Sequence, residues 1–242
     1  MNNIKNLKSV GVIGRGKWGQ IVIKALKSCS SIKYIVGKNV NFKKCSTKVD
    51  WIFILTPNRT HYRMCEFFLK KKVNVFCEKP LTLNLKQATN LYSLAKKNRV
   101  LLYVDDVEIY KQKKFVLLKK NFITREKKDK GNLISLIDRL FYHDAYLIYD
   151  KINKHKTKIK ILSNNSLKFS LTFNRKLIFF FYSINASKKK HMINSINFLT
   201  FKGDPLKKMI NHVLYKLKNH TKNKKRSLFA IKMCVLLKSY FK

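Results

Sequence analysis

The chain has 242 residues, of which 45% are hydrophobic and 12% aromatic, so it carries enough apolar material for a buried core and is not expected to be disordered. Its formal net charge of +42 is typical of proteins that bind nucleic acid or anionic membranes. However, only eight of the 54 basic residues are arginine, and the lysines are spread from end to end. With the abundant Asn, Ile and Phe, this spread indicates an A/T-rich coding sequence, and we expect no specific nucleic-acid partner.

The five cysteines form neither a C-x-x-C pair nor a His/Cys cluster with zinc-ligand spacing, so we expect no metal site and buried thiols in a reducing compartment. No basic segment followed by a long apolar run opens the sequence, which indicates no signal peptide. The longest apolar stretch, residues 177–182, is far shorter than the ~20 residues that span a bilayer. We therefore expect a cytoplasmic protein without a membrane span.

Four of the seven glycines lie between residues 11 and 19, after an apolar run and before a helix-compatible one. This is the G-x-G-x-x-G arrangement of a strand–turn–helix unit that binds a dinucleotide. Gly14 permits the tight turn, Gly16 lets backbone N–H groups approach a pyrophosphate, and Gly19 lets the helix pack close to the strand. The helix N-terminus then faces the anion. A sharp βα turn without a ligand is the alternative.

The first hundred residues alternate short apolar runs with amphipathic stretches, which predicts a buried parallel sheet made of βαβ units. The expected strands are 8–13, 32–36, 51–55, 73–77 and 100–104. The expected helices are 17–28, 60–71 and 84–97. Between Val36 and Trp51 there is room for a loop but hardly for a packed helix, so we expect a trimmed half-sheet.

The second half changes pattern after a lysine-rich, irregular stretch over 105–140. The expected helices are 142–153, about 205–219 and 226–241, and the expected strands are 158–162, 167–173, 176–184 and 192–201. This pattern predicts three parts: a dinucleotide-binding domain at 1–110, a lysine-rich connection at 111–140, and a C-terminal α+β domain at 141–242. The C-terminal domain is expected to have a mainly antiparallel sheet and a last helix that packs back on the first domain.

Two short motifs with proline follow predicted strands. Thr56, Pro57 and Asn58, with His61 shortly after them, follow the strand that ends at Leu55. A second motif, 78–80, follows the strand that ends at Cys77 and reads Glu-Lys-Pro. Because ligands of open α/β sheets bind beyond the carboxyl ends of the strands, both motifs are expected on the cofactor side. A proline that merely ends a strand is the alternative for either motif alone.

The glycine turn, these two motifs and the segment 104–110 together resemble the glucose–fructose oxidoreductase / inositol dehydrogenase / MocA (Gfo/Idh/MocA) family. The resemblance is densest from Gly11 to Tyr110 and rests on pattern more than motif in the rest of the chain. It implies an α/β fold with an N-terminal Rossmann-type parallel sheet and a C-terminal sheet-based domain that covers the substrate and often mediates dimer contacts. The chain is shorter than typical members of that family.

The resemblance implies an NAD(P)-dependent oxidoreductase that acts on a sugar, a sugar nucleotide or a polyol. Lys79 is expected near the nicotinamide and substrate, where it polarises a carbonyl or pairs with a hydroxyl, while Glu78 orients it. The residues expected at the cofactor are Gly14, Arg15, Gly16, Lys17, Trp18, Gly19, Lys38, Thr56, Pro57, Asn58, His61 and Glu78. The residues expected at the substrate are Lys79, Tyr110, His143 and Asp144. Homo-oligomer contacts are expected through the C-terminal sheet.

His143 resembles the family's active-site histidine, presented from the start of a helix, and is the candidate acid or base. Family members usually place an aspartate four residues before this histidine. Here Arg139 holds that position and Asp138 lies one residue away. On an α-helix a slip of one residue rotates a side chain by ~100°, so the spacing departs from the family pattern.

The residues that follow the second predicted strand indicate which cofactor, NAD or NADP, the site favours. NAD-type sites usually carry an acidic residue there for the ribose hydroxyls, but no acidic residue precedes Asp50 in this sequence. Gly37, Lys38 and Asn39 occupy that place, and Arg15 lies within the glycine turn. Because a cation suits a 2′-phosphate, the sequence slightly favours NADP over NAD.

Two further readings stay open. A non-catalytic relative that keeps the fold and binds nucleotide would also lack the ribose carboxylate and the usual aspartate. A basic nucleic-acid-binding protein is the third reading, although no recognition helix or strand-borne aromatic motif supports it.

Overall fold

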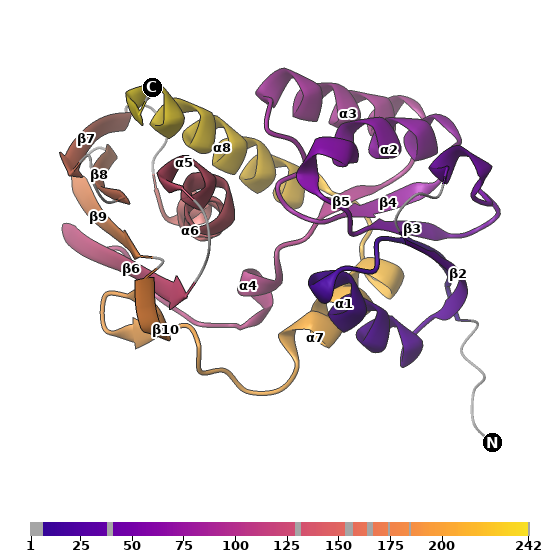
Figure 1. The fold of residues 1–242 in the computed structure, drawn as a ribbon, viewed down its shortest axis with the longest axis horizontal. Helices are drawn as coiled ribbons and strands as arrows, with labels where there is room; N and C mark the ends of the chain where they lie inside the picture. The colour runs from indigo at the N-terminus through magenta and orange to yellow at the C-terminus, as the bar shows by residue number, and fades with distance from the viewer. Residues whose placement is uncertain are drawn as a thin grey trace. The chain divides into compact units, whose positions relative to one another are not determined.

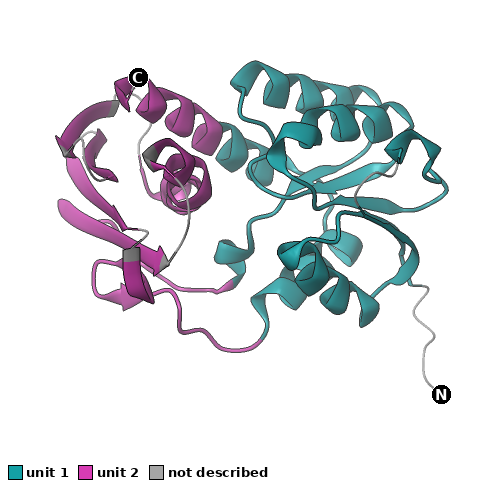
Figure 2. Ribbon diagram, in the orientation of Figure 1, with its two compact units in different colours: residues 1–110, 204–228 teal, residues 111–203, 229–242 magenta. Residues whose placement is uncertain are grey.

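The computed structural model describes residues 7–37, 41–128, 132–152, 157–163, 167–173, 175–183 and 185–241. By their internal contacts, the residues form two compact units (Figure 2). Unit 1 comprises residues 1–110 and 204–228, and unit 2 comprises residues 111–203 and 229–242. Among the described residues, no helix is both long and apolar enough to cross a membrane.

Unit 1 is built on a parallel five-stranded sheet with the strand order β2-β1-β3-β4-β5 (Figure 1). The strands are β1 (Ser9–Ile13), β2 (Ser31–Val36), β3 (Trp51–Ile54), β4 (Asn74–Cys77) and β5 (Leu102–Val104). All four residues of β3 and all three of β5 are buried, which explains why these strands read as continuous apolar runs. The five predicted strands and the parallel sheet are confirmed.

The predicted helices of unit 1 are confirmed as α1 (Lys17–Lys27), α2 (Asn58–Lys70) and α3 (Leu85–Lys97), followed by the short α4 (Val107–Tyr110). Asn84 caps α3, because its side-chain oxygen accepts a hydrogen bond from the Gln87 N–H at 3.1 Å. Between β2 and β3 the described residues contain a single 3₁₀ turn (Phe42–Lys44). The half-sheet on the β2 side is therefore trimmed, as the sequence predicts.

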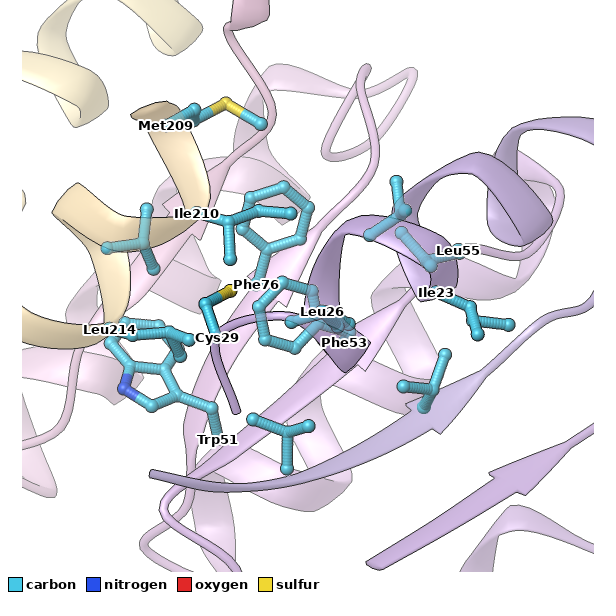
Figure 3. Packing of buried hydrophobic residues seen from close by; sticks show 14 of the residues in the cluster. Ile23, Leu26, Cys29, Trp51, Phe53, Leu55, Phe76, Met209, Ile210 and Leu214 are labelled. Atoms are coloured by element: carbon cyan, nitrogen blue, oxygen red, sulfur yellow. The ribbon is translucent and has the colours of Figure 1, made fainter. Parts of the chain in front are cut away.

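A late part of the chain completes the core of unit 1. The helix α7 (Pro205–Tyr215) is capped by Asp204, whose side chain accepts a hydrogen bond from the Lys207 N–H at 2.9 Å. Its residues Met209, Ile210 and Leu214 are buried in one cluster with residues of α1 and the sheet (Figure 3). The sequence grouped α7 with the C-terminal domain, whereas its apolar face packs in unit 1.

The free edge of β5 is covered by the start of α8 (Thr221–Lys238), a helix whose residues fall in both units. The side-chain amide of Asn223 accepts from the Val104 N–H at 2.9 Å and donates to the Val104 carbonyl at 2.8 Å. One side chain thus occupies the backbone groups that a further strand would use, which protects the edge.

Unit 2 contains a mixed six-stranded sheet with the order β11-β10-β6-β9-β8-β7. The strands are β6 (Lys120–Lys128), β7 (Thr157–Ser163), β8 (Leu167–Phe173), β9 (Lys176–Ser183), β10 (Asn185–Ile193) and β11 (Ile196–Asn197). Only the β6–β9 pair is parallel, which confirms the mainly antiparallel sheet.

Two expectations for this region were wrong. The segment 111–140 is not an irregular connection, because it contains β6 in the middle of the sheet. The expected strand 192–201 is not continuous, because β10 ends at Ile193 and only the two-residue strand β11 follows it. In both strands the inward side chains include a polar residue, Arg125 in β6 and His191 in β10, and lysines crowd the other positions. The alternation of apolar and polar residues that marks a half-buried strand is therefore hidden.

The helical part of unit 2 starts earlier than the predicted 142–153. It comprises α5 (Leu133–Leu136), a π-helical turn (Ile137–Phe141), α6 (Tyr142–Ile148) and a 3₁₀ turn (Tyr149–Lys151). The ring of Phe141 packs edge-on against Phe169 of β8 and Phe180 of β9, with centroids 5.1 and 5.3 Å away. Tyr149 also contacts Phe229 of α8. The chain ends in a 3₁₀ turn (Ser239–Phe241).

Candidate functional site

The glycine turn joins β1 to α1, and its glycines lack a side chain for different reasons. Gly14 has a φ of +114°, and a Cβ there would lie 2.4 Å from the carbonyl oxygen of Leu55. A Cβ at Gly19 would lie 2.5 Å from the carbonyl oxygen of Gly14. A Cβ at Gly16 would meet no atom within 4 Å. Gly14 and Gly19 therefore serve the close packing of the turn, whereas Gly16 faces open space.

The helix α1 begins at this open position. Gly16 is its N-cap and supplies no side chain to the N–H groups of the first turn. That turn contains no acidic residue, and Lys17, its first residue, is exposed. Free N–H groups and the positive end of the helix dipole attract an anion. The turn therefore fits a pyrophosphate whose oxygens approach the backbone at Gly16.

The exposed Arg15 lies beside the end of β2. Its Cδ is 3.6 Å from the place that a Cβ would take at Gly37, and the Gly14 N–H donates to the Val36 carbonyl at 2.9 Å. These contacts bring the Arg15 side chain to the end of β2, where the sequence predicts the ribose end of the cofactor. Lys38, the second cation expected there, lies outside the described residues.

The two proline motifs are joined by His61, which is 1% exposed. Its Nε2 lies 2.7 Å from the Thr56 carbonyl, and its Nδ1 lies 2.9 Å from the Pro80 carbonyl. Burial lowers the pKa of His61, although the hydrogen bonds to these carbonyls act to raise it. Both ring nitrogens are thus engaged with backbone, so the geometry favours His61 as a brace between the two loops over direct contact with a cofactor.

The loop after β3 leads directly into α2. Pro57 is the N-cap of this helix and Asn58 is its first residue. The half-buried Thr56 has its hydroxyl 2.7 Å from the hydroxyl of Thr60. The three motif residues therefore sit at a strand end and a helix start, the part of an α/β fold where ligands bind.

At the ends of β4 and β5 the structure places two acidic residues in neighbouring positions. Cys77 pairs with Val104 in the sheet, so Glu78 and Asp105 follow in register. Asp105 is 4% exposed, and its carboxylate accepts from the Trp18 indole N–H at 3.0 Å and from the Val107 N–H at 3.1 Å.

The charge state of this pair is shifted. Burial raises the pKa of Glu78 to about 8; the Lys79 ammonium opposes this shift and the Asp105 carboxylate adds to it. Burial also raises the pKa of Asp105 to about 6, against the hydrogen bonds from Val107 and Trp18 and the charge of Lys79. Trp18 and Glu78 were expected here from the sequence. Asp105 was not given a role, although two adjacent acidic residues in a chain with only twelve are a readable signal.

Tyr110 belongs to a small polar cluster in unit 1. Its hydroxyl lies 3.0 Å from that of Tyr103, which donates to the Asp106 carboxylate at 2.5 Å. The ring of Tyr110 lies 5.9 Å from that of His212 in α7. Burial raises the pKa of Tyr110 above its ordinary value. The expected substrate contact through Tyr110 stays a prediction.

Asp144, expected at the substrate, has no exposed side-chain surface. Its carboxylate accepts from the Arg125 guanidinium at 3.1 Å, from the Tyr182 hydroxyl at 2.8 Å and from His191 Nε2 at 2.9 Å. Burial opposes its charge, but Arg125 and His191 outweigh burial and hold the pKa of Asp144 well below its usual range. This geometry favours a structural role, in which Asp144 ties α6 to three strands of the sheet.

The half-buried His143 is the second residue of α6 and directly follows the π-helical turn. In that turn the Tyr142 N–H bonds to the Ile137 carbonyl, five residues back. A π turn accommodates one residue more than an α turn, and such turns are frequent at functional sites. Across a π turn, residues five apart, such as Asp138 and His143, therefore lie on the same side of the helix, as residues four apart do in an α-helix. The one-residue slip noted in the sequence thus coincides with a local change of helix type.

Asp138 itself is held by an ion pair. Its carboxylate contacts the ammonium of Lys238, near the end of α8. Both side chains are largely buried, so this contact is part of the packing of unit 2.

The strand order β2-β1-β3-β4-β5, the glycine turn after β1 and the motifs at the strand ends define a dinucleotide-binding α/β fold. Residues 32–106 match the Gfo/Idh/MocA family model, described as "Oxidoreductase family, NAD-binding Rossmann fold". A segment of 58 residues is 38% identical to the uncharacterized oxidoreductase YgjR of Escherichia coli (strain K12). This segment is 24% of the present chain and 18% of that relative. The match to the Gfo/Idh/MocA family model thus lies within unit 1, and the chain covers less than a fifth of the length of this curated relative.

Solved structures share the fold over almost the whole chain. UDP-N-acetylglucosamine 3-dehydrogenase GnnA from Acidithiobacillus ferrooxidans is 17% identical with a TM-score of 0.78, over 97% of this chain and 99% of that one. The WlbA (WbpB) dehydrogenase from Thermus thermophilus, in complex with NAD and UDP-GlcNAcA, is 14% identical with a TM-score of 0.71. The match covers 96% of this chain and 94% of that one. At this identity the likeness establishes the fold and nothing finer.

Proposed function

We propose that this chain is an NAD(P)-dependent oxidoreductase that transfers hydride between nicotinamide and a secondary alcohol or ketone of a sugar, sugar nucleotide or polyol. The observation that carries the proposal is the glycine turn. Its tightly packed Gly14 and Gly19 hold an open Gly16 at the N-terminus of α1, which suits a pyrophosphate. The family match and a neighbour with NAD and a sugar nucleotide support the cofactor and substrate class.

The roles follow from the chemistry of each side chain. The nicotinamide supplies the hydride chemistry, and the protein supplies orientation and proton transfer. Lys79 polarises the substrate oxygen from the end of β4, with Glu78 beside it, and His143 exchanges a proton with the substrate hydroxyl. Arg15, beside the end of β2, pairs with a 2′-phosphate, so NADP is favoured over NAD.

Titration with NADPH and NADH, followed by nicotinamide fluorescence, tests the proposal. We expect binding of both, with NADPH at least ~10-fold tighter and with salt reducing the gap. Gly16→Val should abolish binding, because a branched side chain would fill the space that the pyrophosphate needs. The N-cap has an extended backbone, which valine adopts, so the variant should keep its circular dichroism spectrum. Undiminished binding by Gly16→Val would refute the assignment of the turn.

A non-catalytic nucleotide-binding relative is the second candidate, and the ion pair of Asp138 with Lys238 favours it. An aspartate held in this way is less available to assist His143. Tight binding of NADPH without turnover of any sugar nucleotide or polyol would support this candidate over the first.

Homo-oligomer contacts through the sheet of unit 2 are part of the proposal. Phe122, which is 43% exposed on β6, stacks on Phe179 of β9 with ring centroids 5.3 Å apart, and Phe181 continues the row. An aromatic row on a sheet face suits burial against a second copy. Sedimentation of the protein and of Phe122→Lys tests this contact: we expect a dimer that the lysine weakens.

A further inference from the structure

The two ends of the candidate cofactor site differ in charge. The parallel sheet reverses its strand order at β1, because the chain passes from β1 to β2 on one side and then to β3 on the other. A dinucleotide bound across such a point directs one half toward β2 and the other toward β3, β4 and β5. Arg15 lies on the β2 side, whereas the carboxyls of Glu78 and Asp105 lie at the ends of β4 and β5.

Sheet hydrogen bonds fix the backbone of both residues. The Glu78 N–H donates to the Ile54 carbonyl and the Asp105 N–H donates to the Cys77 carbonyl, each at 2.9 Å. The sheet hydrogen bonding therefore continues into both residues. Their positions are set by the sheet and not by a free loop.

Asp105 is also linked to the pyrophosphate-binding turn. Trp18, two residues after Gly16 in the first turn of α1, donates its indole N–H to the Asp105 carboxylate at 3.0 Å. The second oxygen accepts from the Val107 N–H of α4 at 3.1 Å. Both donors are neutral, so neither cancels the charge of Asp105.

A dinucleotide has the matching asymmetry. Its phosphates are anionic, whereas its nicotinamide ring is cationic when oxidised and neutral when reduced. We propose, on the basis of the proposed function, that Glu78 and Asp105 form a paired-carboxyl subsite that selects the oxidised, cationic nicotinamide ring over the reduced ring. A carboxylate near a cation in a partly buried site attracts it more strongly than in water.

The selection depends on pH. Several groups set the charge of the subsite: Lys79 beside Glu78, Glu108 on α4, Cys77 on β4 and Trp18 on α1. The pKa of Asp105 is raised to about 6 and that of Glu78 to about 8. Both carboxyls are thus mainly protonated in weak acid and mainly ionised in weak base. Preference for the oxidised ring should increase as the pH rises through this range.

The test is the ratio of the dissociation constants of NADPH and NADP⁺, measured by calorimetry at ~pH 5 and ~pH 9. Both ligands share the phosphates and adenosine, so the ratio isolates the ring. We expect the ratio to shift by about tenfold toward NADP⁺ at the higher pH, which is about 1.4 kcal/mol. Asp105→Asn and Glu78→Gln should each remove about half of the shift, because each removes one of the two charges. Glu66→Gln removes a half-exposed carboxyl of α2 that is paired with Lys70, and this control variant should keep the full shift.

Trp18 gives a readout without any ligand. Its fluorescence should change with pH near the pKa of Asp105, and the change should be absent in Asp105→Asn and in Trp18→Phe. Should Asp105→Asn fail to fold, the unaltered chain and Glu78→Gln still decide the question through the ratio.

The outcomes separate the two proposals. If neither cofactor form binds at any pH, the proposed function fails and this inference fails with it. If both forms bind and their ratio is the same at both pH values, the paired-carboxyl subsite is wrong while the proposed function stands. A shift of undiminished size in both carboxyl variants also overturns the subsite.

Discussion

Each unit contains a buried aspartate, Asp105 in unit 1 and Asp144 in unit 2, and the pKa values of the two carboxyls are shifted in opposite directions. Asp105 in unit 1 accepts from neutral donors, Trp18 and Val107, and its pKa is raised to about 6. Asp144 in unit 2 accepts from Arg125 and His191, and its pKa is held well below the usual range. Burial acts on both in the same sense, so the difference comes from the charge of the partners.

The comparison separates a carboxyl at the edge of the sheet where ligands of this fold bind from a carboxyl held within the packing of unit 2. Asp105 lies at the carboxyl edge of a parallel sheet, where ligands of this fold bind, and its raised pKa of about 6 lets it gain or lose a proton near neutral pH. Asp144 lies between α6 and the sheet, with no exposed surface, and its charge is fixed by a guanidinium. The same residue type therefore acquires a different role from its position in the fold.

The largest effect is expected from the two candidate catalytic residues, Lys79 and His143. If both side chains act on the substrate in the transition state, Lys79→Ala and His143→Ala should each lower turnover by ~10²–10⁴-fold without abolishing NADPH binding. The measurement is the steady-state rate on a sugar-nucleotide or polyol substrate found by screening. Loss of binding together with turnover would indicate a structural role instead.

Arg139→Asp tests whether the spacing between the aspartate and His143 limits activity. It adds the carboxylate four residues before His143 that family members usually have. If the spacing is what limits the site, activity should rise; if the π turn already compensates, activity should not change. A fall in activity would count against both readings.

The second-largest effect is expected from the buried Asp144 carboxylate of unit 2. Asp144→Ala leaves the Arg125 guanidinium buried without its carboxylate and should cost about 3–5 kcal/mol of unfolding free energy. Glu126→Ala, which removes a partner 3.8 Å from Lys190 on the same sheet, should cost about 0–1 kcal/mol. Urea unfolding followed by circular dichroism measures both. Equal losses in the two variants would contradict the structural role assigned to Asp144.

The smallest effect is the pH dependence of stability, and its sign differs between the two aspartates. The raised pKa of Asp105 means that the folded state holds the proton more tightly, so its contribution is present below ~pH 4 and is lost as the pH rises through about 6. The lowered pKa of Asp144 means the reverse: its contribution is present above ~pH 4 and is lost as the pH falls below that value.

Thermal unfolding across the acid range checks these signs. Asp105→Asn should flatten the decline between ~pH 4 and ~pH 6. Asp144→Asn should flatten the loss below ~pH 4. The comparison between the aspartates fails if the two variants change the same part of the profile.

Local signals in the sequence determined most of unit 1. The strands β3 and β5 are buried on both faces, so each appears as an apolar run, and the glycine turn needs Gly14 and Gly19 for backbone reasons alone. The short link between Val36 and Trp51 likewise fixed the trimmed half-sheet. The family resemblance rested on these same residues.

Tertiary structure decided what local patterns do not carry. Arg125 could be recognised as an inward residue of β6 only through Asp144, which lies on a different element. His61 became a brace because two separate loops present carbonyls to it, and Asp105 gained its partner from the first turn of α1. A polar side chain is buried only when a distant part of the chain satisfies it, and that distant part is not visible in the sequence around it.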